Sequence, residues 1–174
     1  MDRLLYSCGI FIDLKKAFDT VDHRILLGKL YFYGFRGVLH NWFPSSLTGR
    51  KQTTEVGGHI SSSETITCGV HQGSVLGPIL FLLFINDIQN SSRKFCFYLF
   101  ADDTNILYVN KDLTSLEKVV NEEFKNVYNW LAVNKLTKKS NFVIFHPHQK
   151  KTYQPKVQIY NNETNKLECL EHME

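Results

Sequence analysis

Two adjacent aspartates, Asp102 and Asp103, interrupt the apolar segment YLFADDTNILYV at residues 98–109. Neighbouring carboxylates repel each other, and burial strengthens the repulsion, so the pair is either a solvated turn or a site for a cation. Mg²⁺ is typically held by one or two carboxylates together with substrate phosphates. The doublet alone favours the first interpretation, in which residues 103–105 form a polar turn.

A third carboxylate, Asp13, lies near the end of the apolar segment GIFIDL at residues 9–14, which predicts a short buried strand. The apolar residues on both sides of the doublet predict a hairpin with the two aspartates at its bend. If this strand and hairpin are neighbours in one sheet, three carboxylates converge at one sheet end, as two-metal phosphoryl transfer requires. Adjacent residues of a regular strand point to opposite faces, so Asp103 is the less certain ligand.

Hydrophobic periodicity and turn residues predict the elements that must position these carboxylates. One helix is predicted between Asp22, its expected N-cap, and Gly34, its expected C-terminal stop. Helical spacing predicts another over residues 112–134, with Thr114 and Glu117 as a capping box. The remaining expectations are a short helix at 37–43, a hairpin around Gly57-Gly58, a buried helix within 73–88 with Gly77-Pro78 in its first turn, and closing strands near 141–147 and 156–160.

The order of these elements predicts an α+β fold, in which a mainly antiparallel sheet carries helices packed on one face. We expect residues 1–146 to form one domain and residues 147–174 to form a polar, loosely ordered C-terminal segment.

The composition bounds the class of protein. The chain has 174 residues, of which 43% are hydrophobic, which suits a packed core and excludes disordered and collagen-like classes. A net charge of +3 is weak support for a polyanionic partner. Four scattered cysteines argue against a disulfide framework or a zinc site. There is no secretory signal, and the longest apolar stretch, residues 75–85, is too short to span a membrane, so we expect an intracellular protein.

Four segments, taken together, resemble a known family. FIDLKKAFDTVDH (11–23), GVHQGSVLGPILFLLFIND (69–87), FADD (100–103) and WLAVNKLTKKSNFVIF (130–145) are similar to motifs A, B, C and D of reverse transcriptases, and most similar to those of non-LTR (LINE-type) retrotransposons. The resemblance covers about Cys8 to Phe145. Four motifs in this order are specific, whereas each alone is not.

The resemblance implies a polymerase palm domain that adds deoxynucleotides to the 3′ hydroxyl of a DNA primer on an RNA template. It implies that Asp13, Asp102 and Asp103, with the main-chain carbonyl of Leu14, hold two Mg²⁺ or Mn²⁺ ions. The expected partners are therefore an RNA template, a DNA primer and deoxynucleoside triphosphates, with no membrane involved.

The same resemblance assigns the nucleotide-binding residues. Phe18 matches the aromatic gate that excludes a ribose 2′ hydroxyl, although a phenylalanine there is also typical of the core. Gln72 and Gly73 match motif B, where glutamine lies against the nucleotide and glycine permits close approach; the glycine also suits a plain loop. Lys139, or its neighbour Lys138, matches the motif D lysine that donates a proton to pyrophosphate, although most lysines in such a segment are simply solvated.

Several features depart from the family pattern. His71 replaces the usual proline before Gln72, and motif D is shortened. Most of the fingers and thumb regions are missing from the expected palm, so we expect a fragment. The alternative is a catalytically inactive retrotransposon remnant with at most weak nucleic-acid binding. Lys15, Lys16, Arg50 and Lys51 are either phosphate contacts or ordinary surface charges.

Overall fold

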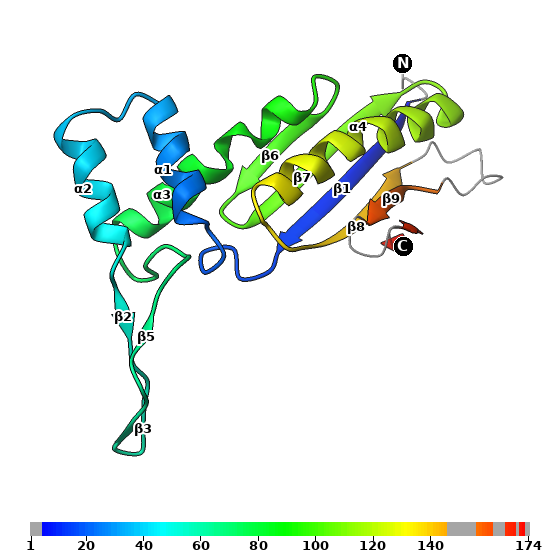
Figure 1. Ribbon diagram of the computed structural model, residues 1–174. Helices are drawn as coiled ribbons and strands as arrows, with labels where there is room; N and C mark the ends of the chain where they lie inside the picture. The colour runs from blue at the N-terminus through cyan, green and yellow to red at the C-terminus, as the bar shows by residue number, and fades with distance from the viewer. Residues whose placement is uncertain (1–4, 146–155, 162–165, 170, 173–174) are drawn as a thin grey trace. The chain divides into compact units, whose positions relative to one another are not determined.

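The computed structural model describes residues 5–145, 156–161, 166–169 and 171–172, with only the backbone of Lys138, Lys139 and residues from 158 onward. The chain divides into two compact units (Figure 1). Unit 1 comprises Met1–Lys15 and Asp87–Glu174, and unit 2 comprises Lys16–Asn86.

Unit 1 is built on a five-stranded sheet with the order β11-β8-β1-β7-β6. Its strands are β1 (Tyr6–Leu14), β6 (Cys96–Phe100), β7 (Asp103–Asn110), β8 (Lys138–Phe145) and β11 (Glu171–His172). All neighbours are antiparallel except β11, which runs parallel to β8 at one edge. The sheet is therefore mainly antiparallel, as the sequence predicts.

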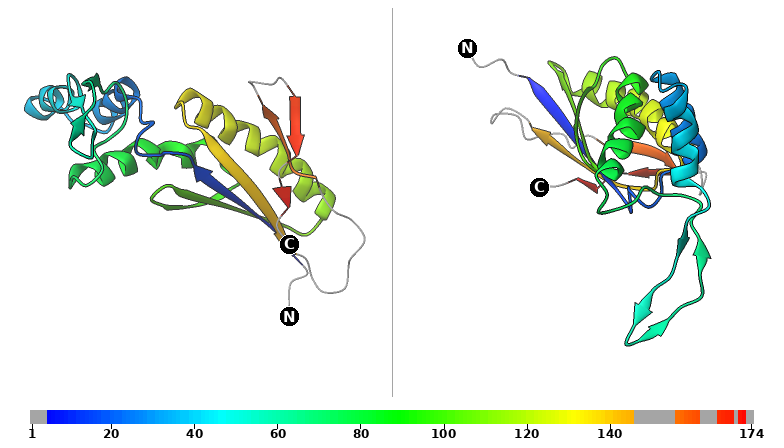
Figure 2. Two further views of the ribbon diagram at one scale, coloured as in Figure 1. Left: turned by 90° about the horizontal axis from the view of Figure 1, so that it is seen from below. Right: turned by 90° about the vertical axis from the view of Figure 1, so that its left-hand side faces the viewer.

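Helix α4 (Leu113–Val133) covers one face of this sheet (Figures 1 and 2). Alternate residues of β1 explain the arrangement: Ile10, Ile12 and Leu14 are buried, whereas Phe11 and Asp13 are exposed on the opposite face. The helix contributes a buried stripe at helical spacing, comprising Leu116, Val120, Phe124, Val127 and Leu131. The expected palm-like α+β fold with helical cover on one face is confirmed.

The start of α4 differs from the predicted capping box. Asp112 is the N-cap, and its Oδ2 accepts a hydrogen bond from the Ser115 backbone N–H at 2.7 Å. An aspartate side chain accepts such hydrogen bonds at least as well as a threonine side chain, so the helix begins after Asp112 and Thr114 does not act as the N-cap. The hydrogen bonds from Ser115 hold the pKa of Asp112 below its usual range.

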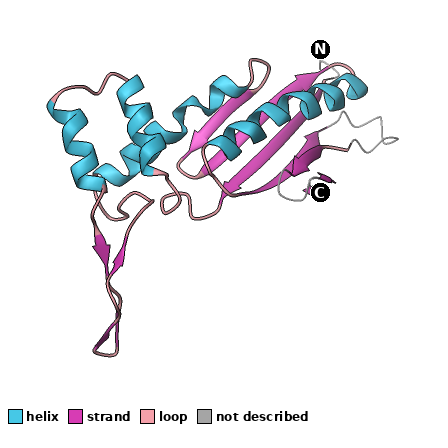
Figure 3. Ribbon diagram, viewed as in Figure 1, coloured by secondary structure: helices cyan, strands magenta, loops and turns pink. Residues whose placement is uncertain are grey.

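Unit 2 contains three helices and a long two-stranded ribbon (Figure 3). The helices are α1 (His23–Phe32), α2 (Val38–Leu47) and α3 (Leu76–Ile85); the ribbon pairs β2 (Lys51–Gln52) with β5 (Glu64–Thr65) and β3 (Glu55–Val56) with β4 (His59–Ile60). Asp22 caps α1, because its Oδ1 accepts hydrogen bonds from Arg24 N at 2.9 Å and Ile25 N at 3.1 Å. Gly34, with φ of 96°, follows the helix as predicted.

Helix α3 is less enclosed than the sequence predicts. Gly77 and Pro78 lie in its first turn as expected, and Phe81 and Phe84 are fully buried. However, Ile79 and Leu82 are 48% and 49% exposed. An apolar helix with no polar face therefore presents one side to solvent, which periodicity alone cannot reveal.

The segment 147–174 is described in part. It contributes β9 (Gln158–Asn161) and β10 (Lys166–Cys169), which pair antiparallel. Val157 is fully buried, and Asn121 of α4 donates from Nδ2 to the Lys156 carbonyl at 3.1 Å. The division into 1–146 and 147–174 stays a prediction. Within the described residues, no helix combines the length and the hydropathy needed to cross a bilayer.

Candidate active site

The aspartate doublet lies at a tight hairpin. Strand β6 ends at Phe100 and β7 begins at Asp103, and these two residues pair, so Ala101 and Asp102 alone form the turn. Ala101 has φ of 51°. A positive φ at the first central residue belongs to the turns in which glycine usually stands, so alanine here is strained.

Asp103 and Asp13 are directly opposite each other in the antiparallel β1–β7 ladder. Opposed residues share a face of the sheet, with Cβ atoms about 4.5–5.5 Å apart, and like charges at such positions are destabilising. Both aspartates are exposed, on the face away from α4. Asp103, the less certain ligand by sequence, is thus the one that shares Asp13's face, while Asp102 lies beside it in the turn.

The row of residues at this sheet end continues into β8. Asp13 is opposite Lys139, whose side chain lies outside the described structure. Leu14 turns its side chain to the α4 face, where it is 2% exposed. The backbone register therefore gathers the predicted residues of unit 1 at one end of the sheet.

No described side chain neutralises the aspartates. Among the residues with described side chains, Asp13, Asp102 and Asp103 have no ion pair and no side-chain hydrogen bond. Nor do any three His, Cys, Asp or Glu side chains in this part of the chain cluster closely enough to hold a metal ion. The register brings two of the predicted carboxylates to directly opposed positions, and the metal site formed by all three stays a prediction.

In unit 2, the segment from Lys16 to Val21 is joined to the segment that precedes α3. Val70 N donates to the Phe18 carbonyl at 2.7 Å, and Gly69 N donates to the Val21 carbonyl at 2.8 Å. The partly buried Phe18 ring packs against Phe81 with centroids 4.7 Å apart. Phe18 thus has a core partner and an accessible surface, so both of its predicted roles remain open.

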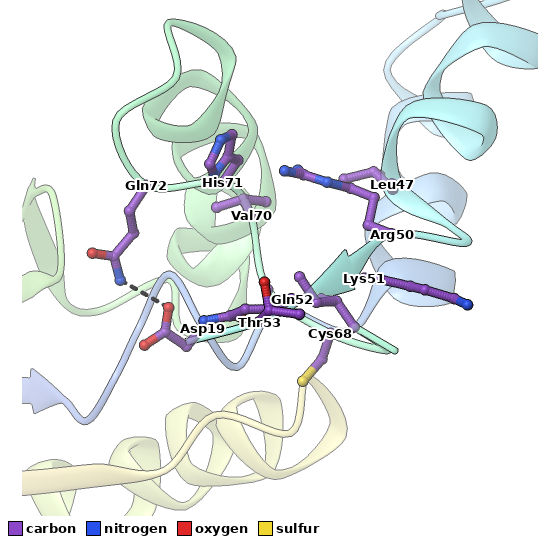
Figure 4. Close-up of a pocket in the computed structure, with 12 residues that line it drawn as sticks. Asp19, Leu47, Arg50, Lys51, Gln52, Thr53, Cys68, Val70, His71 and Gln72 are labelled. Carbon is purple, nitrogen blue, oxygen red and sulfur yellow. Dashed lines mark hydrogen bonds between the residues drawn. The ribbon is translucent and has the colours of Figure 1, made fainter. Parts of the chain in front are cut away.

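Gln72 has an acidic partner that sequence reasoning missed. Its Nε2 donates to Asp19 Oδ1 at 2.8 Å, and Figure 4 shows the two side chains pointing toward each other. The residues are 53 positions apart. The only sequence signal was a carboxylate directly after Phe18, which gives no hint of its partner.

Two glycines shape this junction. Gly69 has φ of 90°, and a Cβ there would lie 2.9 Å from the Asp19 carbonyl oxygen. Gly73 has φ of 81° but open space around it. In unit 2, close backbone approach therefore requires glycine at Gly69, while Gly73 is required by its left-handed conformation.

The comparisons with known proteins agree with this architecture. Residues 2–163 match the family described as reverse transcriptase (RNA-dependent DNA polymerase). Among solved structures, apo telomerase from Candida tropicalis is similar with a TM-score of 0.59 at 12% identity, over 97% of this chain and 33% of that chain. The likeness shows a shared fold.

The chain belongs to the reverse transcriptase family. It is 31% identical over 137 residues to the RNA-directed DNA polymerase from mobile element jockey of Drosophila melanogaster, covering 75% of this chain and 15% of that protein. It is 30% identical over 79 residues to the retrovirus-related Pol polyprotein from type-1 retrotransposable element R2 of Popillia japonica, covering 45% of this chain and 13% of that protein. These relatives are non-LTR retrotransposon polymerases, and the chain spans only a small part of their length.

Proposed function

We propose that this chain is the palm-containing part of an RNA-directed DNA polymerase that extends a DNA primer on an RNA template. The observation that carries the proposal is the register of the sheet, in which Asp103 stands directly opposite Asp13 and next to Asp102 in the turn. The family match supports the choice of reaction.

The donor set of unit 1 fits divalent cations. Mg²⁺ and Mn²⁺ prefer oxygen ligands, and opposed carboxylates without a described counter-charge lower their repulsion when a cation joins them. Asp13, Asp102, Asp103 and the Leu14 carbonyl are the proposed ligands. The chemistry supplied by two such ions is activation of the primer hydroxyl and neutralisation of charge on the triphosphate.

The other residues handle the nucleotide. Phe18 is proposed to exclude the ribose 2′ hydroxyl sterically, and Gln72, oriented by Asp19, to contact the incoming deoxynucleotide. Gly73 keeps the backbone beside Gln72 in a left-handed conformation. Lys139, opposite Asp13 in the ladder, is proposed to protonate the departing pyrophosphate.

One observation favours a second candidate, a non-catalytic remnant that binds nucleic acid weakly. His71 stands where the family usually has proline before Gln72, and motif D is shortened, so the chain departs from the family pattern in two motifs. A chain that keeps the fold but has lost catalysis would bind polynucleotide and would not extend a primer.

Primer extension tests the proposal. The purified chain is incubated with a DNA primer annealed to RNA, deoxynucleoside triphosphates and Mg²⁺, and products are resolved by length. Asp103→Asn is expected to abolish extension, whereas Glu122→Gln, which removes an exposed charge from α4, should leave it intact. Phe18→Ala is expected to admit ribonucleotides.

The outcomes separate the two candidates. Mg²⁺-dependent extension lost in Asp103→Asn supports the polymerase. Absence of extension in every variant, together with salt-sensitive duplex binding unaffected by Asp103→Asn, supports the remnant.

A further inference from the structure

A hollow in unit 2 lies outside the carboxylate row. It has a volume of about 770 Å³ and is bounded by the end of α2, residues 50–53 around β2, residues 66–72 and Asp19 (Figure 4). Every lining residue that the structure describes belongs to unit 2. The space is large enough for a nucleotide unit of a polyanion.

The walls of this hollow are held by backbone hydrogen bonds. On one side, Ile66 N donates to the Arg50 carbonyl at 2.9 Å, beside the Lys51–Thr65 pair of the ribbon. On the other side, Val70 N is bonded to the Phe18 carbonyl at 2.7 Å. Such a framework fixes the backbone positions from which the lining side chains extend, which lowers the ordering cost of binding.

The charge in the hollow is predominantly positive. Arg50, Lys51 and His71 line it, and Asp19, the one carboxylate among the described lining residues, accepts a hydrogen bond from Gln72. Within the described residues, neither Arg50 nor Lys51 has an acidic partner. Arg50 is partly buried, and Figure 4 shows it extending toward His71, whereas Lys51 points away. Partial burial of an unpaired guanidinium is unfavourable until an anion joins it.

The lining also indicates which anion fits. It contains no Phe, Tyr or Trp among the described residues, so it offers no large aromatic platform on which a base could stack. Arg50 presents a planar fork of donors that matches phosphate oxygens, and the side chains of Gln52 and Thr53 add neutral donors. The hollow therefore suits a phosphate group better than a nucleobase.

We propose that this hollow is a phosphate-binding site centred on Arg50, with His71 as its second contact. The phosphate comes either from a polynucleotide backbone or from a free nucleoside triphosphate, and this choice of ligands rests on the proposed function. The site itself depends only on residues of unit 2, so it can be tested independently of the carboxylates of unit 1.

Binding without divalent metal isolates the site. Fluorescence anisotropy of a labelled 12-nucleotide single strand is measured in EDTA over a series of KCl concentrations. Arg50→Gln is expected to weaken binding about tenfold and to reduce the slope of log K against log salt by about one. Arg24→Gln, an exposed arginine of α1 outside the hollow, removes the same charge from unit 2 and serves as the control. Arg50→Lys should retain part of the affinity, and equal melting temperatures confirm that the variants fold.

Two probes, the oligonucleotide and a deoxynucleoside triphosphate, distinguish the sources of phosphate. If a nucleic-acid strand occupies the site, Arg50→Gln lowers the affinity for the oligonucleotide and leaves the affinity for a deoxynucleoside triphosphate unchanged. If a free nucleotide occupies the site, Arg50→Gln lowers the affinity for the triphosphate and leaves the affinity for the oligonucleotide unchanged. Equal losses in Arg50→Gln and Arg24→Gln, or no binding of either probe at low salt, overturn the proposal. Arg50-dependent binding in a chain without primer extension would keep this site while rejecting the polymerase function.

Discussion

Asp13 and Asp103 occupy directly opposed positions on adjacent antiparallel strands, on the face of the sheet that α4 leaves open. Two carboxylates so placed oppose folding unless a cation is shared between them. If the proposed cations bind there, they stabilise the fold, and both stability and metal binding can be measured without catalysis.

Asp103→Asn should raise the stability of the metal-free chain by up to about 1 kcal/mol, because it removes the charge facing Asp13. Mg²⁺ or Mn²⁺ should raise the melting temperature of the unchanged chain and have a smaller effect on the variant. Thermal unfolding in EDTA and in either metal measures both. Glu122→Gln controls for the change in net charge. A melting temperature that changes neither with metal nor with Asp103→Asn would contradict the expectation.

Gly69→Ala should be more destabilising than Gly73→Ala. Both glycines have positive φ, which costs alanine about 1–2 kcal/mol, but only at Gly69 would the added carbon meet the Asp19 backbone. We expect a loss above about 2 kcal/mol for Gly69→Ala and about 1 kcal/mol for Gly73→Ala. Urea unfolding of the pair measures the difference, and equal losses would show that Asp19 moves aside.

Ala101→Gly should stabilise the β6–β7 hairpin by about 1 kcal/mol, because glycine relieves the positive φ at the turn. Urea unfolding provides the measurement. A neutral or destabilising result would mean that alanine is not strained there. Comparing primer extension in the same variant shows whether a relaxed turn still supports activity.

The thiol of Cys8 should be protected from alkylation in the folded chain. Burial raises its pKa from 9.0 to about 12, whereas Cys68 and Cys96 are exposed. The stabilisation from the neutral buried thiol is complete below pH 9 and is lost as pH rises toward 12. Iodoacetamide at pH 8 followed by peptide mass spectrometry should find Cys68 and Cys96 modified before Cys8. Modification of Cys8 at the same rate would contradict its burial.

Local signals predicted much of the fold. Asp22 and Gly34 bounded α1 correctly because caps and stops act through neighbouring backbone groups. The β6–β7 hairpin was predicted by its apolar arms. The sheet face on which Asp103 lies was not predicted. That face depends on a turn of only two residues, and a shift of the strand register by one residue moves every side chain to the opposite face.

Long-range relationships lay beyond sequence reasoning. Asp19 and Gln72 meet where backbone hydrogen bonds join two segments that lie far apart in the sequence, such as the bond from Val70 to Phe18. The boundary between Lys15 and Lys16 also carries no glycine, proline or serine that would mark a linker. Such features follow from tertiary packing, for which a single sequence contains no pattern.

The position of β1 in the sheet has a consequence for how the protein is made. This strand lies between β7 and β8, yet both partners are encoded after the whole of unit 2. At ordinary translation rates β1 is therefore without partners for on the order of 10 s after it is synthesised. During that interval Lys16–Asn86 can fold as a local unit, while the apolar strand β1 has no partner strand. Chaperone binding to the newly synthesised β1 segment should accordingly end when β7 emerges from the ribosome.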